Sequence, residues 1–217
     1  MKSNSVLLQE IISIDGISEE ALSVLLRYVK NGSADAQFIM GWMCLSGEAV
    51  KQNKTKAINL FKRAAVQGQV EAQTKLGDIY YEGDGVSSSY KKALFWYKQA
   101  AEQEDTNAIL MVASMYEQGE GVELDLNEAL KWCLIAADLG DARAYLELAK
   151  IYYNGNINDD DMEKAYFWAS LGYINGKAMV YRISKKMQDS LSETLSNTQI
   201  ERVQMQVADW MKEHGLE

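Results

Sequence analysis

The feature that most constrains the fold is a 36-residue repeat that runs through the middle of the sequence without insertion or deletion. Within each copy, two alanines, one glycine and one bulky residue return at this interval. The four series are Ala36, Ala72, Ala108 and Ala144; Gly47, Gly83, Gly119 and Gly155; Ala57, Ala93, Ala129 and Ala165; and Leu60, Trp96, Trp132 and Trp168. Four repeats therefore cover residues 34–69, 70–105, 106–141 and 142–177.

Each repeat has the pattern of two amphipathic helices joined by a turn. In the second repeat, apolar residues recur at helical spacing from Ala72 to Gly83, and Gly77 beside them leaves room for a neighbouring helix. Gly83 can supply the positive φ of a helix end. The second helix is expected to start at a position that holds a good N-cap residue in every repeat, namely Asn53, Ser89, Asp125 and Asp161.

A single helix pair cannot bury both of its faces, so the pairs are expected to stack into a solenoid. Residues 1–33 and 178–217 keep only part of the pattern and are predicted to form helical caps. The helices predicted in these caps cover Ser5–Ile14, about Ala21–Gly32, Met179–Gln188 and Thr198–Trp210, the last opened by a capping-box match between Thr198 and Glu201. The sequence thus predicts one all-α domain, residues 1–217, with about twelve helices.

The composition argues against several classes of function. The 217 residues include no proline, which favours uninterrupted helices, and carry a net charge of −9, which repels nucleic acids and anionic membranes. The one histidine, His214, leaves few routes to a metal site or a catalytic triad. We expect no catalytic residue, no metal and no cofactor.

The cysteines and the chain ends indicate the compartment. Cys44 and Cys133 are isolated within helical patterns and are predicted to be buried, without a disulfide framework. The first residues lack the apolar core of a signal peptide, and no stretch approaches the ~18 apolar residues of a membrane span. We therefore expect a cytoplasmic protein.

Three motifs could carry chemistry, and each has a simpler structural interpretation. Ser88-Ser89-Tyr90-Lys91 matches the S-x-x-K motif of β-lactamases, but the S-D-N and K-T-G partner motifs are absent. Gly83-Asp84-Gly85 lacks the lysine of a phosphate-binding loop. Four residues alternate like calcium ligands, although glycine and glutamate are missing at the sixth and twelfth positions of that loop; they are Asn154, Asn156, Asn158 and Asp160. A helix-entry loop is the favoured interpretation, and a weak cation site is the alternative.

The repeat resembles the Sel1-like repeat family, a relative of the tetratricopeptide repeat. The second repeat carries the pattern most fully, in Leu76-Gly77, Gly83-Asp84-Gly85-Val86, Trp96-Tyr97 and Ala100-Ala101. The first repeat departs from the pattern at Cys44 and Ala49, and the fourth departs at Asn156-Ile157-Asn158. The resemblance implies a bacterial protein with a right-handed α-solenoid that serves as a scaffold for protein interactions. It implies no particular ligand, because the motif residues are structural.

One surface row varies between the repeats. If the first helices line a concave face, the residues at the positions equivalent to 38, 42 and 45 face a partner. Some of these residues are tryptophan or tyrosine, the types that are enriched at the hot spots of protein interfaces. Some of these residues, such as Phe38, Leu110 and Leu146, could instead pack against the adjacent repeat. The third repeat has seven acidic residues and one basic residue, which suits a basic partner. The candidate protein-binding residues are Phe38, Trp42, Leu45, Asp78, Tyr81, Glu117, Glu120, Glu123, Lys150 and Tyr153.

These features lead to three hypotheses about function. The first is a non-enzymatic adaptor, expected to be a monomer, that binds another protein on its concave face. The second is an immunity protein that neutralises a basic toxin in the bacterial cytosol. The third is a β-lactamase-like hydrolase, which would depend on Ser88 and Lys91 alone.

Overall fold

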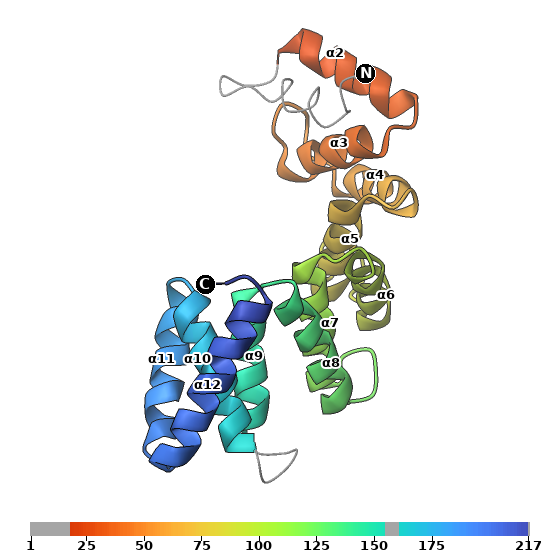
Figure 1. Ribbon diagram of the computed structural model, residues 1–217. Coiled ribbons are helices and arrows are strands. Elements are labelled where there is room, and N and C mark those ends of the chain that lie inside the picture. Colours follow the sequence, from red (N-terminus) through yellow and green to blue (C-terminus); the bar gives the residue numbers. More distant parts are fainter. Residues whose placement is uncertain (1–17, 155–160, 217) are drawn as a thin grey trace. The chain divides into compact units, whose positions relative to one another are not determined.

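The computed structural model describes residues 18–154 and 161–216, and every regular element within these ranges is an α-helix (Figure 1). The helices there are α2 (Glu19–Lys30), α3 (Ala34–Ser46), α4 (Lys54–Val66), α5 (Val70–Glu82), α6 (Tyr90–Ala101), α7 (Thr106–Gln118), α8 (Leu126–Asp138), α9 (Ala142–Tyr153), α10 (Asp161–Asn175), α11 (Met179–Ser192) and α12 (Asn197–Glu213). The predicted all-α class is confirmed. The helix predicted over Ser5–Ile14 lies outside the described residues.

The described chain forms two compact units. The first contains the described residues up to Ala108 together with Glu120–Val122, and within it α2 packs on α3, α3 pairs with α4, α4 contacts α5, and α5 pairs with α6. The second contains Ile109–Gly119 and the described residues from Glu123 onward, and within it α8 packs on α9, while α10 contacts α9, α11 and α12. Among the described helices, none has the length and apolar character needed to cross a bilayer.

The alanines that repeat in the sequence lie in the interior of the helix pairs. The alanines at both repeated positions are fully buried in all four copies, and Leu60 and Trp168 are nearly so. Cys44 and Cys133 are buried and unbridged, as predicted. A side chain larger than alanine would find no space at the repeated alanine positions, so close packing requires alanine there in every repeat.

The first and second helices of a pair approach closely at one glycine. A Cβ atom on Gly41 would lie 2.7 Å from the Phe61 ring, and one on Gly77 would overlap the Tyr97 ring. The equivalent pairs in the third and fourth repeats are Ala113 with Cys133 and Ala149 with Ala169. Glycine therefore stands where the opposite residue is an aromatic ring, and alanine where it is small.

The turn between the two helices is closed in the same way in three repeats. Gly47 and Gly83 end α3 and α5 in the left-handed conformation, with φ of +84° and +78°. The backbone N–H groups of Asn53, Ser89 and Asp125 then donate to carbonyls nine residues earlier, at 2.7–2.9 Å, on Cys44, Tyr80 and Tyr116. These bonds fix where each second helix begins.

The predicted helix starts are only partly correct. Asn53 and Asp125 cap α4 and α8 through their side chains, but the side chain of Ser89 makes no capping bond. Asp161 is the first described residue of α10 and is buried, and the residues before it lie outside the described ranges, so its role as a cap stays a prediction.

The last helix also starts earlier than predicted. The capping box of α12 is formed by Ser196 and Gln199, so the prediction of Thr198 and Glu201 is wrong. Both pairs have the same S/T-x-x-E/Q spacing. Only the pair of Ser196 and Gln199 also contacts α10, because Gln199 Nε2 donates a hydrogen bond to Glu163 at 2.8 Å.

In each of the first two repeats, a buried glutamine accepts a hydrogen bond from a second glutamine. Gln37 and Gln73 are buried; Gln67 Nε2 donates to Gln37 at 3.0 Å, and Gln103 Nε2 donates to Gln73 at 2.8 Å. Gln73 also donates to the Ala65 carbonyl at 3.1 Å, near the end of α4. In the third repeat the equivalent residues are Ile109 and Leu139, so the polar pair is replaced as a pair by an apolar one.

The close approach of α3 and α4 gives a double-mutant prediction. Gly41→Ala should lower the free energy of unfolding by about 1–3 kcal/mol, because its methyl group overlaps the Phe61 ring. In a Phe61→Cys background the same change should be neutral or stabilising by about 0.5–1 kcal/mol, since only the better helix propensity of alanine remains. Urea unfolding of the four proteins measures this coupling, and additive effects would contradict it.

A second prediction concerns Glu104, which has a φ of +65° at a position where Gly32, Gly68 and Gly140 have φ of +80° to +90°. Glu104→Gly should raise the free energy of unfolding by about 0.5–1 kcal/mol, because it removes the strain of a left-handed non-glycine residue. The matched control is Glu102→Gly, where φ is −62° and glycine should be destabilising. Thermal unfolding that moves in the same direction for both variants would show that the strain is absent.

Candidate protein-binding surface

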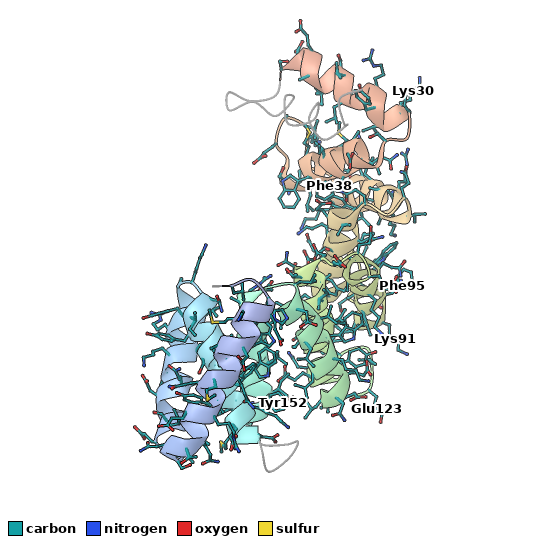
Figure 2. The ribbon with its side chains drawn as sticks, viewed as in Figure 1. Lys30, Phe38, Lys91, Phe95, Glu123 and Tyr152 are labelled. Atoms are coloured by element: carbon teal, nitrogen blue, oxygen red, sulfur yellow. The ribbon has the colours of Figure 1, made fainter. Side chains whose placement is uncertain are left out.

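In the first unit, the predicted row begins with Phe38, Trp42 and Leu45 on α3. The Trp42 side chain is 47% exposed, whereas Phe38 and Leu45 are half-buried. The Phe38 ring lies 5.7 Å from the Phe61 ring, between centroids, so it packs on the second helix of its own repeat. Figure 2 shows Phe38 on α3 and, on another side of the same unit, Lys91 and Phe95 on α6. Trp42 is therefore the aromatic residue of α3 that is most available to a partner.

A chain of polar contacts links Trp42 to the second repeat. Lys75 Nζ lies 5.3 Å from the centroid of the Trp42 ring and 3.5 Å from the Asp78 carboxylate. Asp78 also accepts a hydrogen bond of 2.8 Å from the Tyr97 hydroxyl. Burial of the Tyr97 ring, with the charge of Asp78, raises the pKa of this tyrosine, which therefore stays protonated as the donor. These contacts order the surface around Trp42 without covering the ring.

Tyr81 and Glu120 come together in the first unit. The Tyr81 hydroxyl donates to Glu120 at 2.8 Å, and the Tyr81 and Tyr90 rings lie 5.2 Å apart. The hydrogen bond to Glu120, with burial, raises the pKa of Tyr81 to about 12. Two of the predicted binding residues are thus bonded to each other, which lowers the capacity of each to bind a partner through the same atoms.

In the second unit, Glu117 and Lys150 line a groove between α7, α9 and α11, which we call the α7–α9–α11 groove. Its volume is about 340 Å³. The apolar residues that line it are Leu110, Met111, Leu146, Met179, Val180 and Ile183. Tyr153 is 41% exposed at the end of α9, and Glu123 is exposed in the loop before α8; neither lines this groove.

The charged side chains that line the groove differ in whether an oppositely charged group is bonded to them. Lys150 Nζ lies 2.8 Å from the Glu147 carboxylate. Arg143 Nε donates to Asp141 at 2.9 Å. Burial, followed by the charge of Glu147, raises the pKa of Glu117, while Lys150 acts weakly in the opposite direction. The groove therefore holds a carboxylate that water solvates poorly and that a like charge opposes.

The α11 side of this groove could hardly be predicted from the sequence. Met179, Val180 and Ile183 follow the point where the 36-residue register decays, so no repeat position predicted their place. The signal that remained is the spacing of apolar residues in α11, which indicates an amphipathic helix but not the helix it covers.

The groups that could act in catalysis have ordinary structural surroundings. Burial raises the pKa of Cys133 to about 12 and also raises that of Cys44, so both thiols are protonated at neutral pH and are weak nucleophiles. Ser88 and Lys91 are both exposed. Within residues 18–154 and 161–216, no three His, Cys, Asp or Glu side chains are grouped so as to hold a metal ion. The alternative of a weak cation site around Asn156, Asn158 and Asp160 concerns residues outside the described ranges.

Known proteins resemble this chain in fold and in sequence. A Sel1 repeat protein from Oxalobacter formigenes is 32% identical, with 76% of this chain and 68% of that one covered and a TM-score of 0.69. The protective antigen c5321 of uropathogenic Escherichia coli strains is 21% identical, with 89% of this chain and 49% of that one covered and a TM-score of 0.55. No curated protein matches the sequence.

The family model of the Sel1 repeat matches four segments of the sequence. They are residues 34–69, 70–105, 106–141 and 142–177, the same ranges that the 36-residue spacing defines. Together they cover about two thirds of the chain. They include α7 and α9 of the α7–α9–α11 groove, whereas α11 lies outside them. The chain belongs to the Sel1 repeat family.

Proposed function

We propose that this protein is a non-enzymatic scaffold that binds another protein through the exposed surface of its first helices. One observation carries the proposal: the alanines that are shared by every repeat are buried, whereas the positions that differ between repeats include an exposed aromatic side chain, Trp42. A tryptophan that is about half exposed and held beside Lys75 gives a partner a large apolar contact at a low cost in side-chain entropy.

The reactive groups support a role without catalysis. The Cys133 thiol is buried and protonated, and its pKa is about 12. Ser88 and Lys91 stand at the start of α6, where Ser89 occupies the N-cap position. A helix start of this kind accounts for the S-x-x-K spacing without a hydrolase.

A narrower function is that of an immunity protein for a basic toxin. The observation that favours it is the charge of the third repeat, which has seven acidic residues and one basic residue. Such a field speeds the encounter with a basic partner. If this protein fails to relieve the lethality of a toxin encoded beside its own gene, the immunity role is wrong.

The scaffold proposal predicts that Trp42→Ala weakens partner binding by about tenfold or more, the loss expected at an interface hot spot. Affinity purification from the native cell, followed by titration of the recovered protein, measures this loss. The matched control is Phe95→Ala, since Phe95 is a 56% exposed aromatic residue on a second helix. A recovered partner that is equally indifferent to both changes, or no specific partner at all, would contradict the proposal.

A further inference from the structure

The α7–α9–α11 groove combines apolar walls with a carboxylate, that of Glu117, to which no described side chain is hydrogen-bonded or ion-paired. Leu110 and Met111 come from α7, Leu146 from α9, and Met179, Val180 and Ile183 from α11. These residues lie in one unit, so the groove does not depend on how the two units are placed. Its walls suit aliphatic side chains of a bound segment.

The cations that line the groove already have acidic partners. Lys150 is paired with Glu147, and Arg143 with Asp141. Within the described part of the chain, no side chain donates a hydrogen bond to the Glu117 carboxylate or forms an ion pair with it. Burial and the charge of Glu147 raise the pKa of Glu117, and the opposing effect of Lys150 does not cancel them, so the carboxylate is only partly compensated.

We propose that the α7–α9–α11 groove binds a segment of a partner protein in which one lysine or arginine stands between aliphatic side chains. The basic side chain lies beside Glu117 and Glu147, and the aliphatic side chains contact Leu146, Met179 and Ile183. This inference rests on the proposed scaffold function and gives it a site and a partner chemistry.

The charges of the groove decide between the possible occupants. A wholly apolar segment would remove more water from Glu117 without replacing it, at a cost that grows as the carboxylate is buried. An acidic segment would add a third negative charge near Glu117 and Glu147. A basic side chain instead supplies a charge-assisted hydrogen bond, which is stronger than a neutral one.

The test uses a phage-displayed library of short random peptides, selected on the full chain. We expect the enriched peptides to share a lysine or arginine flanked by aliphatic residues. Glu117→Gln should weaken the best synthetic peptide by about tenfold or more, because the ionic contact is lost while the shape is kept. Glu201→Gln is the matched control, since Glu201 is an exposed glutamate on α12 that does not line the groove.

Replacement of the peptide's basic residue by norleucine completes a double-mutant cycle. Norleucine should weaken binding to the wild-type protein and should cause little further loss with Glu117→Gln. Met179→Ala, which changes a 60% exposed apolar side chain, should also weaken binding while the protein remains folded.

Three results would overturn the inference: no enriched peptide, enriched peptides without a basic residue, or equal losses for Glu117→Gln and Glu201→Gln. A partner recovered through Trp42 while these peptides fail would refute the groove alone and leave the scaffold function in place. Peptides that bind as expected while Trp42→Ala has no effect on a recovered partner would place recognition in the groove and not on α3.

Discussion

The close approach of the two helices in each repeat is the constraint on which the rest of the structure depends. At Gly41 a single added carbon atom would come within 2.7 Å of the Phe61 ring, and the same relation holds between Gly77 and Tyr97. The large ring fills the space that the glycine leaves, so the two positions can change only together. The third repeat, with Ala113 and Cys133, shows the other solution to the same packing problem.

The buried glutamines and their partners also change only together, and the reason here is hydrogen bonding and not side-chain volume. Gln103 donates a hydrogen bond to the buried Gln73, and loss of Gln103 would leave the buried amide oxygen of Gln73 without this donor. Ile109 and Leu139 replace both amides at once in the next repeat, which removes the polar groups together with the need to satisfy them. A repeat can thus alter its interior while the spacing of its helices stays at 36 residues.

The regular parts of this fold could be predicted from the sequence because one spacing specifies them four times. The buried alanines and the glycine helix ends are fixed by sterics that act within one repeat, so their positions follow from periodicity alone. The start of α12 could not be chosen in the same way, because Ser196 and Thr198 offer equal local capping, and the contact of Gln199 with Glu163 that accompanies the earlier one is tertiary. The α11 side of the groove was missed for a related reason: Met179 and Ile183 belong to a helix outside the repeat register.

The carboxyl group of Glu117 is not hydrogen-bonded or ion-paired within the described chain. Its pKa is raised by burial, so the folded chain favours the protonated form, and ionisation at neutral pH opposes folding. The sign is opposite to that of Glu163, whose pKa is lowered by hydrogen bonds from Gln199 and Arg202 and whose charge therefore favours the folded state. Both residues are glutamates on helices of the same unit, but only Glu163 has its carboxylate held by hydrogen bonds within the chain. The carboxylate of Glu117 can still accept a hydrogen bond from a ligand, and for that reason the groove around Glu117 is where we expect a basic partner to bind.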